Sequence, residues 1–468
     1  MFNLVEYYSI IVIKDIWEGE VNLKESITDE FLNNSFNRFK DNINNKVLMD
    51  AISKNGIDAA SINNQVIAKD QHAFSIDIDA GKVTDQKKSG RCWMFAGLNI
   101  IRQGIIEKYK IKDFELSECY LMFWDKLEKA NLFLENIIST VDETIDSRIV
   151  TMFLKLPVPD GGDWGLFCNL VKKYGVMPKY SMLETFHSSN SEKMNALLNS
   201  KLREGALKIR EIHDENGTSE EMRHEKEDIL NAIFSMLCRF LGEPPKRFDF
   251  EYRDTDKKFF GYENITPVEF FNKFVGIDVD EYVSVINAPT RDKKFGVLYQ
   301  IPYYGNVVEA GYMTYLNVDI GTMKDLAIKQ LKDNEEVWFG CDVTKMSNRE
   351  LGVMDSSLYD YDLALGTDII IPKGEKLDYR DSSPTHAMAL TGVNLVNDRP
   401  NRWKVENSWG EKNGKDGYFV MDDSWFDEYT YEVIINKKYL SDKLKAALEK
   451  EPIKLKPWDP ICSFAVLK

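Results

Sequence analysis

The amino-acid sequence predicts an α+β fold, in which helices and strands occupy different stretches of the chain. Amphipathic helical patterns dominate up to about residue 245, and strand-like runs dominate from about residue 290. Such segregation favours α+β, because an α/β fold would alternate the two kinds of element. Hydrophobic residues make up 43% of the 468 residues and aromatic residues 12%, enough for a sizeable core. A disordered chain is excluded, because it would be poorer in both.

The helical part of the chain begins with an arm. Residues 26–70 are rich in Asn, Lys and Asp with scattered apolar positions, which predicts helical arm segments outside the core. We expect Ser117 to cap the second core helix, residues 157–162 to form a loop, and the last long helix to end at Gly242. Apolar residues spaced three and four apart predict helices over residues 92–109, 116–134, 164–173 and 191–245.

The second half of the chain has the texture of a sheet. A helix is expected at 323–331 and a last helix at 439–449, followed by a Pro-punctuated apolar tail over 452–468. Apolar and β-branched runs bounded by turn residues predict strands at 296–301, 307–318, 337–343, 386–396, 403–407, 417–421 and 431–435.

The charge balance and the hydropathy of the chain exclude several classes of protein. The formal net charge is −16, which argues against nucleic acid or an anionic membrane as the main partner. The apolar run at 7–13 has seven residues, far fewer than the roughly 20 that a spanning helix needs. No positive charge precedes this run, so we expect neither a membrane span nor a secretory leader.

The cysteines indicate a reducing compartment. Six cysteines occur in the chain, and none forms a C-x-x-C pair or another spacing typical of a metal site. Reduced thiols of this kind are typical of cytoplasmic proteins, where most are small buried side chains. We therefore expect a cytoplasmic protein without a metal or another cofactor.

One cysteine has surroundings that suit a nucleophile. Cys92 lies where a helical pattern begins, so its sulfur would face free backbone N–H groups and the positive end of the helix dipole. These features lower the pKa of a thiol, and we expect a thiolate at neutral pH. Gly90 would allow a close approach of backbone or substrate. The competing interpretation is a buried cysteine with a purely structural role.

A cysteine nucleophile requires a base and a group that orients the base. His386 opens the apolar run at 386–396, whereas the other histidines lie in charged or loop-like contexts. Asn407 follows 21 residues later, and a hairpin would place its side-chain oxygen beside the His386 ring. The other ring nitrogen would then face Cys92, the arrangement of a catalytic triad with Asn in the orienting position. Trp409 would cover this pair and exclude water.

These motifs resemble a known family. Gln86, the sequence Cys92-Trp93-x-Phe95, His386-Ala-Met and Asn407-Ser408-Trp409-Gly410 resemble the papain-like cysteine peptidases. The form Gly90-Arg91-Cys92-Trp93 resembles the bleomycin hydrolases, the family called aminopeptidase C in bacteria. Cys92 and His386 are 294 residues apart, against about 130–150 in papain and the cathepsins. The surplus matches the predicted helical insert.

The resemblance implies a fold and an activity. The expected fold is the papain-like one, a helical half plus an antiparallel β half with an inserted helical domain. The expected activity is that of an intracellular cysteine aminopeptidase, which releases N-terminal residues from peptides through an acyl-enzyme intermediate. The family is described as a homohexamer with a C-terminal arm in each cleft, so the resemblance also implies that assembly.

The resemblance also implies roles for individual residues. Cys92 would be the nucleophile, His386 the general base and acid, and Asn407 the residue that orients His386. Gln86 and the Cys92 backbone N–H would form the oxyanion hole. The substrate-binding residues implied by the resemblance are Gly161 and Gly162, which would pair with substrate backbone, and Lys468, whose terminal carboxylate would pair with the free amine of a substrate. Specificity for free N-termini would follow from the arm in the cleft.

The pattern of elements and the resemblance together predict the division of the chain. The predicted parts are an N-terminal extension (1–25), an N-terminal arm (26–70), the helical half of the catalytic domain (71–190), an inserted helical region (191–290), the β-rich half (291–440), and a C-terminal helix and arm in the cleft (441–468).

Two other functions use the same residues. A Cys-His-Asn acyltransferase would share the chemistry, although Gln86 and Asn407-Ser408-Trp409 favour the peptidase. A non-catalytic papain-like scaffold would have lost Cys92, His386 or Gln86, and the sequence retains all three.

Overall fold

The computed structural model describes residues 26–69 and 71–461, and the chain divides into two compact units. The first unit comprises Met1–Asn63 and Tyr359–Ile369, and the second comprises Asn64–Leu358 and Ile370–Lys468. The predicted extension at 1–25 lies outside the described residues. A segment from the second half of the sequence therefore completes the unit that contains the predicted arm.

The regular elements among the described residues of the first unit are helices. Its helices are α2 (Asp29–Asp41), α3 (Ile43–Asn55), α4 (Ile57–Ser61) and α15 (Tyr361–Leu365). The Thr28 hydroxyl caps α2 by accepting from the Phe31 N–H. The Asp360 N–H donates to the Ser61 carbonyl at 2.8 Å, which joins the two chain segments. The helical elements predicted for this stretch are confirmed.

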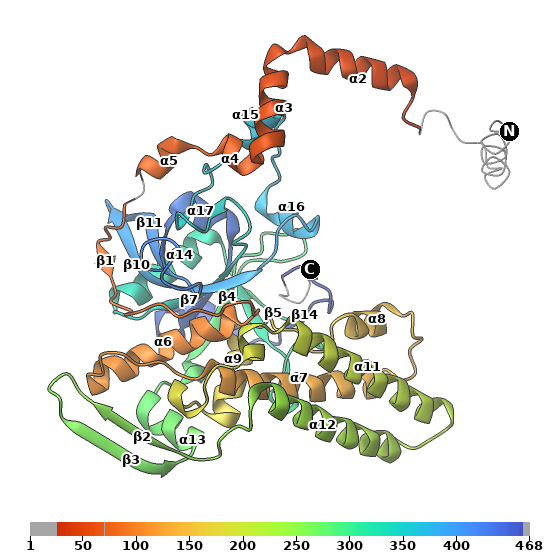
Figure 1. The fold of residues 1–468 in the computed structure, drawn as a ribbon, viewed down its shortest axis with the longest axis vertical. Coiled ribbons are helices and arrows are strands. Elements are labelled where there is room, and N and C mark those ends of the chain that lie inside the picture. Colours follow the sequence, from red (N-terminus) through yellow and green to blue (C-terminus); the bar gives the residue numbers. More distant parts are fainter. Residues whose placement is uncertain (1–25, 70, 462–468) are drawn as a thin grey trace. The chain divides into compact units, whose positions relative to one another are not determined.

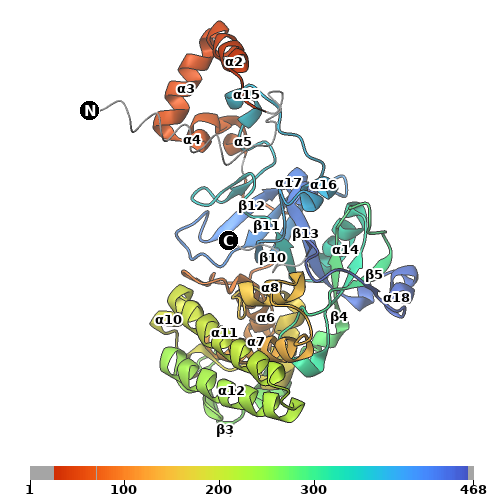
Figure 2. The same ribbon diagram turned by 90° about the vertical axis from the view of Figure 1, so that its right-hand side faces the viewer.

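The second unit contains a layer of helices and a sheet. Figure 1 shows α6, α7, α11 and α12 gathered on one side of the sheet, and Figure 2 shows α10, α11 and α12 close together. Its α-helices are α5 (Asn64–Lys69), α6 (Cys92–Tyr109), α7 (Glu118–Ser139), α8 (Arg148–Lys155), α9 (Trp164–Tyr174), α10 (Phe186–Ser189), α11 (Glu192–Asp214), α12 (Ser219–Leu241), α13 (Pro267–Phe270), α14 (Ile320–Lys332), α16 (Lys373–Asp378), α17 (Asp423–Tyr429) and α18 (Asp442–Leu448).

The sheet is large and mostly antiparallel. Within the described residues it has twelve strands, in the order β14-β5-β6-β4-β13-β7-β10-β11-β12-β9-β8, with β1 added beside β10. The strands are β1 (Ile76–Asp77), β4 (Tyr282–Ile286), β5 (Val297–Gln300), β6 (Thr314–Asn317), β7 (Val337–Cys341), β8 (Ser347–Asn348), β9 (Val353–Met354), β10 (His386–Val396), β11 (Arg399–Glu406), β12 (Tyr418–Asp422), β13 (Thr430–Asn436) and β14 (Ile453–Lys454).

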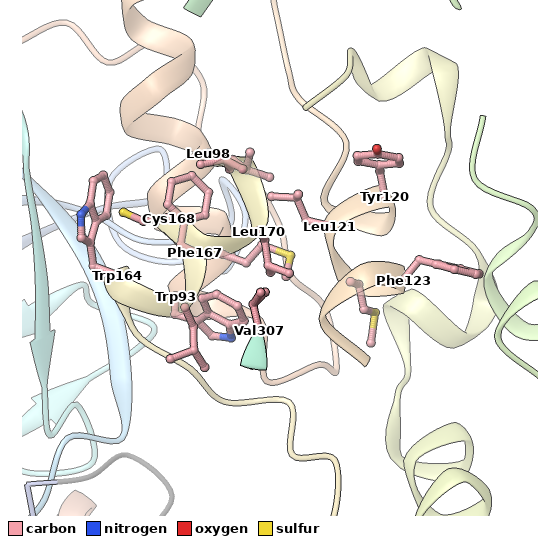
Figure 3. Packing of buried hydrophobic residues seen from close by; sticks show 14 of the residues in the cluster. Trp93, Leu98, Tyr120, Leu121, Phe123, Trp164, Phe167, Cys168, Leu170 and Val307 are labelled. Carbon is pink, nitrogen blue, oxygen red and sulfur yellow. The ribbon is translucent and has the colours of Figure 1, made fainter. Parts of the chain in front are cut away.

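The helical layer has a densely packed aromatic core. In Figure 3, Trp93 of α6, Leu121 of α7 and Phe167 of α9 lie on the facing sides of their helices, and all three belong to one buried cluster. A Cβ at Gly97 would lie 2.9 Å from the Phe167 ring, so glycine allows α6 and α9 to approach closely. The indole Nε1 of Trp338 on β7 donates to the Trp93 carbonyl at 3.1 Å. This bond ties the helical layer to the sheet.

Many predicted elements have the expected bounds, and a few differ. Helix 92–109 and strand 386–396 are found as predicted, and Ser117 and Gly242 cap their helices as expected. The structure adds a two-stranded hairpin, β2 (Phe248–Arg253) with β3 (Phe259–Ile265), and it places β4 in the main sheet, all within the range expected to be helical. For β2 the sequence suits a strand, because apolar and polar residues alternate over its first half and the apolar ones are buried.

Two further differences concern the sheet and the hydropathy of the helices. The strand expected over 307–318 is confined to β6, because its first half forms a short 3₁₀ turn at Val308–Ala310. In residues 26–69 and 71–461, none of the helices combines the length and the apolar character that crossing a bilayer requires.

Candidate active site

Residues from both layers of the second unit line one cavity of about 460 Å³. Cys92 comes from the start of α6, His386 from the start of β10, and Gln86 from the segment that leads into α6. Gly161 and Gly162 also line this cavity. The structure therefore brings together five of the predicted site residues, although 294 positions separate the cysteine from the histidine.

Cys92 is the first residue of α6. The preceding residue, Arg91, is the N-cap, and its guanidinium makes two hydrogen bonds to the Glu184 carboxylate, at 3.0 and 2.7 Å. A Cβ at Gly90 would lie 2.7 Å from the Asp160 Cβ, so this position requires glycine for the close approach that its motif predicts. The N–H groups of Trp93 and Ala387 hydrogen-bond to the Cys92 sulfur. Ala387 follows His386, so the sulfur lies next to the start of β10.

The direction of the pKa shift of Cys92 differs from the prediction. Burial raises the pKa of the Cys92 thiol to about 11, although the hydrogen bonds from backbone N–H groups act in the opposite direction. Burial also lowers the pKa of His386 to about 4. The expected lowering of the thiol pKa is therefore not found, because desolvation outweighs the helix terminus.

His386 and Asn407 lie side by side, as the hairpin predicts. Strands β10 and β11 pair antiparallel, with Ala389 opposite Glu406. The Nε2 atom of His386 is 2.9 Å from Oδ1 of Asn407, and the Ser408 N–H donates to the same oxygen at 2.8 Å. An amide oxygen only accepts, so Nε2 carries the hydrogen and Nδ1 is left as the acceptor. Nδ1 is the nitrogen that a thiol proton would reach.

An aromatic side chain covers the His386–Asn407 pair. The Trp409 ring lies 4.7 Å from the His386 ring, centroid to centroid, at an angle of 30°. The Arg349 guanidinium lies 4.5 Å from the centre of the Trp409 ring. Asn407 is 1% exposed, so water does not compete for its hydrogen bond. The cover predicted for Trp409 is confirmed.

Gln86 is held by the same segment that carries Asn407. The Gln86 Oε1 accepts from the Ser408 hydroxyl at 2.6 Å, and the Gln86 N–H donates to the Ser408 carbonyl at 2.9 Å. The Gln86 Nε2 donates one hydrogen to the Ser89 carbonyl at 2.6 Å. A primary amide has two N–H groups, so a second donor is available at the edge of the cavity.

The loop at 157–162 is fastened by two buried lysines. Lys129 Nζ donates to the Gly161 carbonyl and to the Asp125 carboxylate, both at 2.7 Å. Lys126 Nζ forms an ion pair with Asp160 at 2.6 Å. These bonds fix the backbone of the loop where it lines the cavity.

The two glycines of this loop have different surroundings. A Cβ at Gly162 would lie 2.7 Å from the Trp93 ring, whereas a Cβ at Gly161 would meet nothing within 4 Å. Gly162 is therefore required for packing against α6, and Gly161 faces open space beside the cavity.

The C-terminal tail reaches this cavity. Residues Ile453–Lys454 pair with β5 as strand β14, and Asp459 forms a buried ion pair with Lys293 at 2.8 Å. The Arg148 guanidinium lies 3.9 Å from the centre of the Trp458 ring. Ile461, 6% exposed, lines the cavity that contains Cys92 and His386. The predicted substrate-binding residue Lys468 lies outside the described residues.

Several residues that shape the site do not stand out in the sequence. Ser408 belongs to a predicted motif, but its bond to Gln86 spans 322 residues and no local pattern indicates it. Asp160, Lys126 and Lys129 look like ordinary surface charges in the sequence, yet they fix the glycine loop. Only the apolar character of the tail pointed toward Ile461.

Three comparisons relate this chain to known proteins. The sequence model described as the Peptidase C1-like family matches residues 26–462. Aminopeptidase C of Listeria innocua is 46% identical over 444 residues, which cover 95% of this chain and 100% of that protein. Aminopeptidase C of Lactobacillus delbrueckii subsp. lactis is 44% identical over 422 residues, which cover 90% and 94%. The crystal structure of PepW from Lactobacillus rhamnosis matches with a TM-score of 0.92 and 46% identity, over 93% of this chain and 98% of that one.

Proposed function

The chain belongs to the Peptidase C1-like family and is a papain-like cysteine aminopeptidase of the C type, and from that premise we propose how its residues divide the reaction. Cys92 is the nucleophile, His386 moves the proton, Asn407 holds His386, and Gln86 with the Cys92 N–H binds the oxyanion. The observation that carries this assignment is the 2.9 Å contact of His386 Nε2 with Asn407, in the cavity that also contains Cys92.

We propose that the reaction begins from the neutral pair, the form that burial of both groups favours. As the Cys92 sulfur attacks the carbonyl carbon of the first peptide bond, its proton passes to Nδ1 of His386. Transfer within the pair creates both charges at once, so neither has to exist alone in the buried cavity. The Asn407 oxygen then stabilises the imidazolium through Nε2, and the oxyanion accepts from Gln86 Nε2 and the Cys92 N–H.

Two further proton transfers complete the cycle. His386 donates its Nδ1 proton to the leaving amine, the C–N bond breaks, and a thioester links the N-terminal residue to Cys92. A water molecule then gives a proton to His386 and attacks the thioester carbon. The C–S bond breaks, the free amino acid leaves, and the Cys92 thiol recovers its proton from His386.

A panel of substrates tests this assignment. Aminoacyl fluorogenic substrates, with and without an N-terminal acetyl group, would be compared on the wild-type enzyme and on Cys92→Ala. We expect the wild type to cleave the unblocked substrates alone and Cys92→Ala to cleave none. Cleavage by Cys92→Ala at the wild-type rate would contradict the mechanism.

We propose that the C-terminal arm restricts cleavage to free N-termini. Support comes from Ile461, which already lines the cavity, and from the anchors at Trp458 and Asp459 that precede it. An arm in the cleft would leave room for one or two substrate residues, and its terminal carboxylate at Lys468 would pair with the substrate amine. Deleting residues 464–468 should then allow cleavage of N-acetylated peptides. A truncated enzyme that still demands a free amine would exclude the arm as the gate.

We also propose that the protein is a homohexamer. Helices α2 and α3 of the first unit have no buried residues, and Phe31, Phe36 and Val47 are 58%, 61% and 68% exposed. Apolar exposure on this scale is typical of surfaces that bind a partner. Light scattering at micromolar concentration should give a hexamer, and a lone 54.1 kDa species would contradict the proposal.

The proposed compartment is the cytoplasm, and the proposed substrates are peptides. The cysteines among the described residues are free thiols, which suits a reducing environment. Fractionation of cells followed by an activity assay would test the location.

A further inference from the structure

We propose, on the basis of the function proposed above, that Glu406 is a positioning residue for the reaction. It links helix α6, which begins at Cys92, to strand β11, which ends immediately before Asn407. Glu406 touches none of the reacting atoms. Its action would be to hold the segment that carries Asn407, and through it His386, in register with the helix that carries Cys92.

The Glu406 carboxylate joins three segments of the site. Its Oε1 accepts from Asn99 Nδ2 and from Arg102 Nη2, both on α6 and both at 3.0 Å. Asn99 Nδ2 also donates to the Thr84 hydroxyl at 3.0 Å, and the Thr84 carbonyl accepts from the Gly410 N–H at 3.1 Å. Thr84 lies two residues before Gln86. The segments that carry Cys92, Gln86 and Asn407 thus meet at one carboxylate.

The position of this link suits alignment and excludes direct chemistry. Along α6, Asn99 and Arg102 lie about 10 and 15 Å from Cys92, at 1.5 Å per residue. The Glu406 side chain is 1% exposed, so water does not replace these hydrogen bonds. A small shift of β11 along α6 would move Asn407, and the His386 ring that it holds would lose its alignment with the Cys92 sulfur; reaction rates depend steeply on such displacements.

The surroundings of Glu406 make the link sensitive to protonation. Glu406 Oε2, Arg102 Nε and both carboxylate oxygens of Glu336 are buried without a hydrogen-bond partner in the described part of the chain. Burial raises the pKa of Glu406 to about 7, and burial together with the charge of Glu406 raises the pKa of Glu336 well above its ordinary value. The charged or titratable groups that act on Glu406 and Glu336 are Arg102, Lys404, Glu107 and, from β12, Tyr418.

Because of this environment, we expect the strength of the link to depend on pH. Above pH 7 the ionised carboxylate accepts charge-assisted hydrogen bonds from Arg102 and Asn99, which are the stronger kind. As the pH falls through 7, Glu406 gains a proton and the link weakens. The part of kcat that depends on the link is therefore present at alkaline pH and is lost on acidification.

The test compares Glu406→Gln with the wild type across pH, using an unblocked aminoacyl fluorogenic substrate. Gln keeps an acceptor oxygen and removes the charge. At pH 8 we expect kcat to fall about tenfold with KM unchanged, the difference between a charge-assisted and a neutral hydrogen bond. The ratio of wild-type to variant kcat should shrink toward one as the pH falls to 5.5, because the wild-type carboxylate is then protonated.

Two further variants keep the outcome interpretable. Glu336→Gln replaces the neighbouring buried carboxyl, whose raised pKa keeps it protonated while Glu406 titrates, so it should leave kcat at pH 8 within twofold and the pH step unchanged. Asn99→Ala removes the other end of the hydrogen bond and tests the link if Glu406→Gln folds poorly. The double variant Asn99→Ala with Glu406→Gln should lose less than the product of the single losses, because both act on one link.

The outcomes separate this inference from the proposed function. Wild-type kcat in Glu406→Gln, or a ratio to wild type that is constant from pH 5.5 to pH 8, would overturn the positioning role. Activity that survives in Cys92→Ala would instead overturn the function on which the inference rests. Thermal unfolding of each variant, followed by circular dichroism, would show that the change in kcat occurs in folded protein.

Discussion

The two layers of the second unit position their site residues in different ways. On the sheet side, His386 begins β10 and Asn407 follows the end of β11, and the pairing of these two strands supports the 2.9 Å contact between the side chains. On the helical side, Cys92 is placed by the start of α6, which is locked by aromatic packing and by the buried Arg91–Glu184 ion pair. The base and the residue that orients it are thus positioned together by one hairpin, whereas the nucleophile is positioned separately by the helical layer.

The site exists only where the helical layer and the sheet meet. The bonds that cross between the layers near the site include those of Trp338 with Trp93 and of Glu406 with Asn99 and Arg102. The difference teaches that a hairpin can encode a base with its orienting residue, while alignment with a nucleophile depends on long-range contacts. Variants of each layer should therefore fail in different ways.

The largest effect is expected on the helical side. Cys92→Ala removes the only atom that forms the acyl bond, so kcat should fall by at least about 10⁴-fold while the fold persists. Single-turnover assays with unblocked aminoacyl substrates measure the loss. Cys119→Ala, at another buried cysteine of the helical layer, is the control and should keep most of the activity. A large residual rate in Cys92→Ala would place the nucleophile elsewhere.

The next effect concerns stability on the sheet side. Burial lowers the pKa of His386 to about 4 from an ordinary 6.5, so below pH 6.5 the unfolded chain binds a proton that the folded protein refuses until pH 4. Stability should therefore fall as the pH drops from 6.5 to 4, by about 3 kcal/mol in total from this residue. Urea unfolding at several pH values should show that His386→Gln lacks this part of the slope. Parallel curves for both proteins would contradict the prediction.

A smaller effect on kcat is expected when His386 loses the residue that orients it. Asn407→Ala should lower kcat by about 10- to 100-fold and leave the fold intact, because His386 keeps its position on β10 but loses the acceptor for Nε2. The loss should be smaller than in Cys92→Ala. Steady-state kinetics on unblocked substrates check this, with Asn401→Ala on the exposed part of β11 as the control. Equal activity in variant and wild type would remove Asn407 from the site.

The smallest effect concerns the tail, which contacts both layers. Asp459→Asn weakens the buried ion pair with Lys293, so the arm should dock less firmly and N-acetylated substrates should be cleaved a few-fold faster. Asp292→Asn is the matched control, because Asp292 also pairs with Lys293 but is 63% exposed. If both variants cleave N-acetylated substrates at the same rate, the docking of the tail does not control substrate selection.

Local periodicity predicted much of this architecture. The bounds of α6 and β10 follow from apolar spacing, and the contact between His386 and Asn407 follows from one hairpin. The hairpin β2–β3 was missed, because alternation over six residues was outweighed by the long helical stretch before it. The assembly of Gln86 with Ser408 could not be predicted from local patterns, since it depends on contacts across more than 300 positions.

The pKa of the nucleophile shows a second limit of the sequence. The start of a helix is visible in a sequence, and it predicts a lowered thiol pKa. The opposing effect, burial beneath two layers, depends on the whole fold, and here it is the larger one. Glu406 illustrates the same point, because nothing near it in the sequence distinguishes it from a solvated charge.

The burial of Cys92 has a consequence for the oxidation of its sulfur. Peroxides attack thiolates, and burial, which raises the pKa of the Cys92 thiol, acts against the thiolate form. The side chain is also 9% exposed, so a peroxide has little access to it. We therefore expect sulfenic and sulfinic acids to form more slowly at Cys92 than at an exposed thiol of the same pKa.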